Sequence, residues 1–266
     1  MAHRTARSLR HEYELYVEQE IENYKESIPR PAILAIGDEA AAKLASEPQF
    51  VLTEVLLCEE VDRIIQRRLR VPKYDTWRRK RMKLHEEMRR PEHWGLSRDD
   101  ALVRTIGEAA DIGGAAGHVL VAGEIAERSA LFLAANGCDV TALEAEEESV
   151  RRVMEAAVHA GLAERVHAVA VELGQWTPDT PLQAVVCSHS ALSTLSARER
   201  ARVLAVLQSA TTDGGVHLVE TILAGSSAIE ELRATYRGWD VSVEAARGES
   251  QVFLARKEQV DNRVSH

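Results

Sequence analysis

The stretch HVLVAG at residues 118–123 decides the fold. A short apolar run that ends in glycine is typical of a buried strand followed by a turn. The residues after it, IAERSALFLAANG at 125–137, predict a helix, and strand and helix then alternate as far as residue 257. Because parallel strands must be joined by crossovers, this alternation predicts an α/β fold with a mostly parallel sheet and helices on both faces.

The expected sheet has seven strands. We place them at 119–123, 139–145, 165–173, 181–189, 215–221, 239–245 and 250–257. Helices are expected at 148–161, 197–210 and 228–238, besides the one after the first strand. The last two strands have only a glycine-containing turn between them, so we expect an antiparallel edge.

The chain before this region has a different composition. Residues 1–110 carry 20 basic and 20 acidic side chains, whereas the remainder carries 33 − 20 = 13 basic and 42 − 20 = 22 acidic ones, the whole net charge of −9. Helical periodicity and proline breaks predict four or five helices before residue 110. We therefore divide the chain into a helical N-terminal module at 1–110, which acts as a lid or an interface, and an α/β domain at 111–266.

Several classes of protein are disfavoured. No run of 18 apolar residues is present and the N-terminal residues show no secretory signal, so we expect no membrane span. The three cysteines Cys58, Cys138 and Cys187 are far apart, which argues against a disulfide framework or a zinc site. We expect a cytoplasmic protein without a metal.

Acidic residues stand at the ends of the second and third expected strands, at Glu144 and Glu172, and an Asp213-Gly214-Gly215 turn comes at the start of the fifth. With the first strand and its helix, this order resembles class I S-adenosylmethionine (SAM) methyltransferases. The stretch PLQAVV…ALSTLS…R…VL…DGG, between residues 181 and 215, is similar to the small-molecule and tellurite-resistance type. The resemblance implies a Rossmann-like seven-stranded methyltransferase sheet. It also implies that Glu144 binds the ribose hydroxyls of SAM and Glu172 the adenine amino group. The other implied cofactor contacts are Ala122, Gly123, Glu124, Ala145, Leu173 and Ser188.

The loop after the first strand departs from the family pattern, acidic-x-Gly-x-Gly-x-Gly. Here the same frame reads VAGEIAE at 121–127, and only Gly123 remains. We expect weak or lost SAM binding, because Ile125 adds bulk and Glu127 adds negative charge where glycine lets the backbone approach the cofactor. Arg128, the next residue, could compensate by pairing with the carboxylate of SAM.

His189 follows the fourth expected strand, at the edge where open α/β sheets bind ligands. It is the candidate catalytic residue, a general base that would deprotonate the methyl acceptor. The alternative, which we favour, is that it caps the loop by hydrogen bonds to the backbone.

Residues 61–90 hold 12 basic and 4 acidic side chains, including the run Arg78-Arg79-Lys80-Arg81. Such a run indicates either nucleic-acid binding or a solvated helix face paired with acidic neighbours, and we favour the second. Three functions therefore compete, in this order. They are methyl transfer to a small molecule, an inactive methyltransferase fold that binds a protein partner through the N-terminal helices, and RNA methylation. A second copy of the chain is a further candidate partner.

Overall fold

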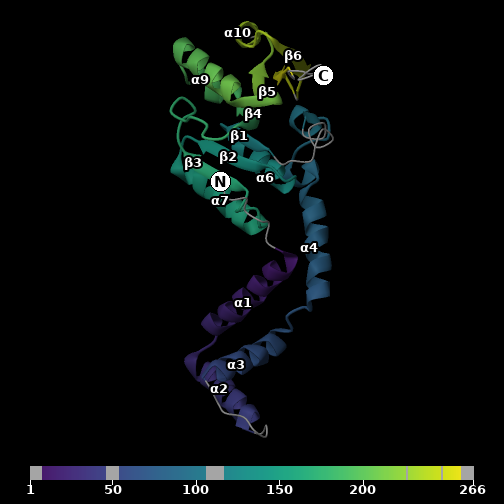
Figure 1. Ribbon diagram of the computed structural model, residues 1–266, viewed down its shortest axis with the longest axis vertical. Coiled ribbons are helices and arrows are strands. Elements are labelled where there is room, and N and C mark those ends of the chain that lie inside the picture. The colour runs from purple at the N-terminus through teal and green to yellow at the C-terminus, as the bar shows by residue number, and fades with distance from the viewer. Residues whose placement is uncertain (1–7, 46–53, 106–116, 226, 247, 259–266) are drawn as a thin grey trace, which may run out of the picture. The chain divides into compact units, whose positions relative to one another are not determined.

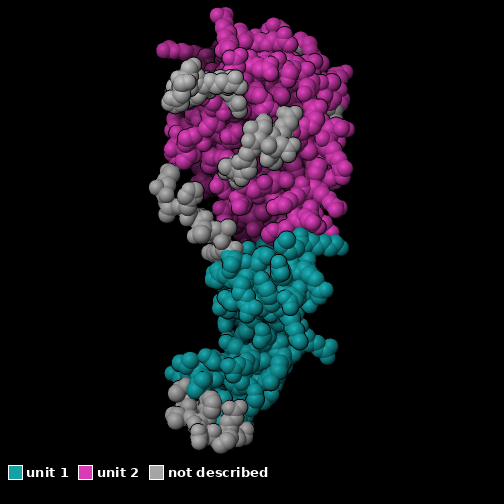
Figure 2. Space-filling model, turned by 45° about the vertical axis from the view of Figure 1, so that its right-hand side comes forward, with its two compact units in different colours: residues 1–84 teal, residues 85–266 magenta. Residues whose placement is uncertain are grey.

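The computed structural model describes residues 8–45, 54–105, 117–225, 227–246 and 248–258. The chain forms two compact units, Met1–Leu84 and His85–His266, coloured separately in Figure 2. The module boundary expected at 110/111 lies outside the described residues and stays a prediction. No helix in the described ranges is long and apolar enough to cross a membrane.

The first unit is helical, as expected. It contains α1 (Leu9–Ser27), α2 (Arg30–Ala45), α3 (Glu54–Leu69) and most of α4 (Tyr74–Met88). Ser8 begins α1 by accepting a hydrogen bond from the backbone N–H of His11, which satisfies one of the free donors at a helix start. A small core joins the first three helices, made of Ile21, Ile36, Ala40, Ile64 and Ile65.

The second unit contains a seven-stranded sheet in the order β3-β2-β1-β4-β5-β7-β6 (Figure 1). The strands are β1 (His118–Ala122), β2 (Asp139–Glu144), β3 (Val166–Ala170), β4 (Leu182–Ser188), β5 (Thr211–Leu223), β6 (Trp239–Ala245) and β7 (Ser250–Lys257). The first five pair in parallel, and β7 pairs antiparallel with both β5 and β6. The expected α/β fold with an antiparallel edge is confirmed.

Helices cover both faces of this sheet. They are α6 (Ala126–Ala135), α7 (Glu147–Ala160), α8 (His189–Ser193), α9 (Ala197–Ala210) and α10 (Ala228–Thr235), and residues 101–105 are also helical. Val119 and Val121 of β1 pack in one core cluster with α6 and α7. Leu120 and Ala122 pack in another with α9 and α10. Neighbouring residues of a strand point to opposite faces, so β1 contributes to both layers.

Two strands differ from the expected ranges. β3 ends at Ala170, so Glu172 and Leu173 lie in the turn after it. β5 begins at Thr211, which pairs with Leu182 ahead of a register shift in the β4–β5 ladder. The Asp213-Gly214-Gly215 sequence is therefore part of the strand and not a turn before it, which corrects the prediction.

A buried polar network joins β5 to the region after α10. The His217 ring is 1% exposed, with Nε2 2.7 Å from Thr211 Oγ1 and Nδ1 2.7 Å from the Tyr236 hydroxyl. Thr211 Oγ1 donates its proton to the Leu207 carbonyl at 2.7 Å, so His217 must donate from Nε2 and accept at Nδ1. Burial lowers the pKa of His217 to about 3, and the ring is neutral.

Candidate functional site

The candidate site lies at the carboxyl ends of β1, β2, β4 and β5. The strand order reverses between β1 and β4, because β2 and β3 extend from one side of β1 and β4 starts the other side. Open α/β sheets bind their ligands in the crevice at this reversal. The last register pair of β1 and β4 is Ala122 with Cys187, so the residues that follow it line the reversal point.

Gly123 is the first of these residues, and it has no room for a side chain. Its φ is +90°, a conformation that side-chain-bearing residues rarely adopt. A Cβ at this position would lie 2.2 Å from Ser188 Oγ and 3.1 Å from Ala191 Cβ. The one glycine that the loop keeps is thus required by the close approach of β1 and β4.

Ser188 and His189 connect β4 to α8. Ser188 is fully buried, and its Oγ lies 2.6 Å from Ser190 Oγ and accepts from the Ala191 N–H at 3.4 Å. Ser188 is thus the N-cap of α8, the role that we expected of His189. His189 is half-buried and lines an open cavity of about 300 Å³, whose other lining residues belong to α8, α9 and α10 and are mostly apolar.

The loop 124–128 differs from its expected arrangement. Ile125 is 3% exposed and belongs to the core cluster of α6, so its side chain does not fill the cofactor edge. The steric argument for weak SAM binding is therefore wrong at this residue. Glu124, Glu127 and Arg128 are exposed, the last two in the first turn of α6.

Glu144 ends β2 and is half-buried, and Ala145 after it is exposed. Burial raises the pKa of the Glu144 carboxyl, Arg152 opposes this, and the charges of Glu127 and Glu146 add to it. The charge of Glu127 thus acts on the Glu144 carboxyl, at the β2 side of the loop. No hydrogen bond to the Glu144 carboxylate occurs within the described part of the chain, so it is available to a ligand.

The segment after β3 presents two of the predicted contacts. Glu172 is exposed, and its backbone carbonyl accepts from the Gln175 N–H at 2.9 Å. Leu173 is 5% exposed and packs in the core cluster that includes α9 and α10. The turn can offer the Glu172 carboxylate to a ligand, whereas the Leu173 side chain is used in packing.

Glu220, near the end of β5, was missed from the sequence. It pairs in register with Ser188, and burial raises the pKa of its carboxyl, which Arg128 opposes and Asp100 reinforces. Thr221 beside it has a φ of +63°, which is unusual for a β-branched residue. The available signal was an acidic residue inside the apolar run VHLVETIL at 216–223.

A family model described as "Tellurite resistance protein TehB" matches residues 103–243, more than half of the chain. The chain belongs to the TehB family. It is accordingly a member of the class I SAM-dependent methyltransferase superfamily, and the resemblance inferred from its strand ends is confirmed.

Solved structures with a similar fold include TehB from Haemophilus influenzae, at 17% identity and a TM-score of 0.47. That match covers 57% of this chain and 61% of the other. The glycopeptide N-methyltransferase MtfA complexed with SAM matches at 16% identity and a TM-score of 0.47, covering 59% and 94%. The N-methyltransferase NodS from Bradyrhizobium japonicum WM9 matches at 10% identity and 0.47, covering 61% and 100%. No curated protein matches the chain by sequence.

Cys187 lies at this edge of the TehB-family domain, where it pairs in register with Ala122. Burial raises the pKa of Cys187 to about 12, so its thiol is protonated and unsuited to act as a nucleophile. Among the described side chains no group of three or more His, Cys, Asp or Glu could hold a metal ion.

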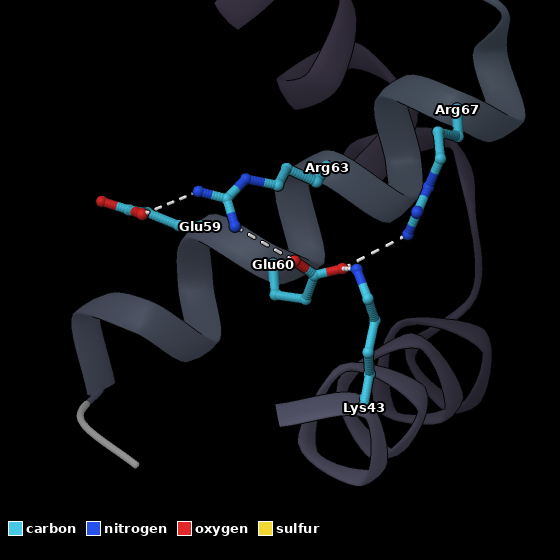
Figure 3. A network of polar contacts seen from close by, with 5 residues as sticks. All are labelled: Lys43, Glu59, Glu60, Arg63 and Arg67. Carbon is cyan, nitrogen blue, oxygen red and sulfur yellow. Dashed lines mark hydrogen bonds and ion pairs between the residues drawn. The ribbon is translucent and has the colours of Figure 1, made fainter. Parts of the chain in front are cut away.

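Several cations of the basic segment, residues 61–90, form ion pairs within the first unit. Glu60 of α3 is 2% exposed and is surrounded by cations (Figure 3). Lys43 Nζ lies 2.5 Å from its carboxylate, Arg63 3.2 Å and Arg67 3.3 Å. The hydrogen bond from Lys43 is the largest influence that lowers the pKa of Glu60. Arg63 also pairs with Glu59, at 3.3 Å.

Two arginines of the basic run on α4, residues 78–81, also have partners within the first unit. Arg81 pairs with Glu12 at 3.4 Å, and Arg79 donates to the Asp75 carbonyl at 3.3 Å. Trp77, the aromatic residue directly before this run, packs against three tyrosines, Tyr13, Tyr16 and Tyr74. These contacts favour an intramolecular role for the segment over RNA binding.

Proposed function

We propose that this protein is a SAM-dependent methyltransferase that acts on a small molecule. The observation that carries the proposal is the free Glu144 carboxylate at the end of β2, beside the reversal of strand order. A half-buried carboxyl that accepts no hydrogen bond from the protein is costly to keep, and the ribose hydroxyls of a nucleoside would satisfy it.

The acidic residues at the edge fit such a cofactor. Glu144 places a carboxylate at the end of β2, and Glu172 places one after β3. Glu144 would accept hydrogen bonds from the ribose and Glu172 from the adenine amino group. When bound, SAM supplies an electrophilic methyl group on a sulfonium. The protein then has to align an acceptor with that methyl group and exclude water.

The cavity lined by His189 is our candidate for the acceptor site. Its walls are mainly apolar, with Leu192, Leu204 and Leu232 among them, and the ion pair of Arg200 with Glu231 at 3.1 Å adds a polar element. Small-molecule sites commonly combine apolar walls with a few polar groups. The His189 imidazole can hold the proton that a hydroxyl or amine acceptor loses.

Calorimetric titration of SAM and S-adenosylhomocysteine tests the cofactor assignment. Glu144→Ala should weaken both ligands by about 1.5–3 kcal/mol, the range for a hydrogen bond to a charged group. Glu155→Ala is the matched control, because Glu155 is an exposed carboxylate on α7. Equal affinity in wild type and Glu144→Ala would show that this ribose site is not used.

Acceptors can be sought with methyl-labelled SAM. The panel should contain small amines, alcohols and thiols, and also tellurite because of the family's description. His189→Ala should lower the transfer rate to any acceptor found. A folded protein that binds neither SAM nor S-adenosylhomocysteine would favour the scaffold function, with the N-terminal helices as the interface.

A further inference from the structure

Residues of the candidate site lie side by side at the carboxyl ends of β1, β4 and β5. Ala122 pairs with Cys187, and Cys187 pairs with Val219. The next residues on the three strands are Gly123, Ser188 and Glu220, and the last two are themselves a register pair. With neighbouring strands ~4.8 Å apart, Glu220 lies roughly 10 Å from Gly123 along this edge.

The side chain of Glu220 belongs to the face covered by α6. Leu218 of β5 packs in the core cluster of α6, and Val219 packs in the cluster of α9 and α10. Because successive side chains of a strand alternate between faces, Glu220 follows Leu218 to the α6 side. Arg128 lies on that side too, in the first turn of α6.

A β-bulge separates Glu220 from β7. Val219 pairs with Phe253 and Ile222 with Gln251, so two residues of β5 face one of β7. Thr221, in the bulge, has a φ of +63°. Bulges redirect side chains and are common beside active sites, and strained backbone is concentrated at functional sites.

Glu220 and Arg128 influence each other without forming an ion pair. Burial raises the pKa of Glu220, Arg128 lowers it, and Asp100 raises it. Among the described residues none donates a hydrogen bond to the Glu220 carboxylate. The Asp100 carboxylate is used by its own turn, where it accepts from the Ser97 N–H at 2.7 Å. Two opposite charges thus stand near each other at the cofactor edge, each free to take a ligand group.

We propose that Arg128 and Glu220 clamp the amino-acid end of SAM, Arg128 through the carboxylate and Glu220 through the ammonium group. The inference rests on the proposed function, which places SAM at this edge. A zwitterion suits a pair of opposite charges that are held apart, because each charge gains a partner that the fold does not supply. The clamp provides with side chains what the family's glycine loop provides with backbone.

Three ligands separate the parts of this clamp. S-adenosylhomocysteine carries both the carboxylate and the ammonium group, decarboxylated SAM keeps only the ammonium, and 5′-methylthioadenosine has neither. Glu220→Gln should weaken S-adenosylhomocysteine and decarboxylated SAM by about 10- to 100-fold and leave methylthioadenosine unchanged. Arg128→Gln should weaken S-adenosylhomocysteine to a similar degree and leave the other two unchanged.

The controls are Glu155→Gln and Arg237→Gln, which remove exposed charges elsewhere in the second unit. Unchanged binding of S-adenosylhomocysteine in both clamp variants would overturn the inference. So would an equal loss for all three ligands, since that indicates damage to the whole pocket. If wild type binds none of the three, methylthioadenosine included, the proposed function itself fails and the clamp falls with it.

Discussion

Gly123→Ala should destabilise the second unit by about 2–5 kcal/mol. Alanine at a φ of +90° costs about 1–2 kcal/mol. Its Cβ would lie 2.2 Å from Ser188 Oγ, so the hydroxyl must leave the cap of α8, which costs about 0.5–2 kcal/mol more. Residual crowding against Ala191 adds to both.

Urea titration followed by tryptophan fluorescence measures this effect, because three of the four tryptophans lie within residues 85–266. Gly238→Ala is the matched control. Gly238 has a φ of +82° and nothing within 4 Å of its added Cβ, so it reports the backbone cost alone. Gly123→Ala should lose at least ~1.5 kcal/mol more than the control. Equal losses in the two variants would refute the close approach of β1 and β4.

Three further changes test other parts of the structure. Ile125→Gly should cost about 3–5 kcal/mol of unfolding free energy, because the side chain is in the core; higher SAM affinity with unchanged stability would restore the steric interpretation of the loop. His217 has a folded-state pKa of about 3, below the unfolded value of ~6.5. The stability that the neutral ring gives the folded state is therefore complete above pH ~6.5. It is lost as pH falls toward 3, by up to ~1.4 kcal/mol per pH unit. His217→Gln should flatten the pH dependence of unfolding in this window, and an unchanged slope would contradict the neutral, buried ring. Labelled RNA should not be retained at low salt, since Arg67 of α3 and Arg81 of α4 have internal partners; retention that falls steeply with salt and is reduced by replacing Arg78, Arg79 and Arg81 with Gln would favour RNA binding.

The sheet could be predicted from the sequence where local pattern and tertiary contacts agree. β6 and β7 occupy the predicted residues, 239–245 and 250–257, because alternating side chains and a short turn specify a hairpin locally. β5 is longer than predicted because Thr211 gains a partner in Leu182. That pairing joins parts of the chain that are distant in sequence, so no local sequence pattern predicts it.

The candidate site was predictable to a similar extent. The position of Glu144 at the end of β2 follows from chain order and strand length. The orientation of Ile125 could not be predicted, since burial of one loop residue depends on how α6 packs. Glu220 was missed because it lies inside an apolar strand, and the bulge that frees it from β7 depends on long-range register.

Calorimetry of S-adenosylhomocysteine with wild type, Glu144→Ala and Glu155→Ala is the most direct test of a ribose site at Glu144. If Glu144 binds the ribose, S-adenosylhomocysteine should bind saturably to wild type and to Glu155→Ala, with an affinity about 10- to 100-fold lower in Glu144→Ala. No binding by folded wild-type protein, or equal binding by all three proteins, would contradict it.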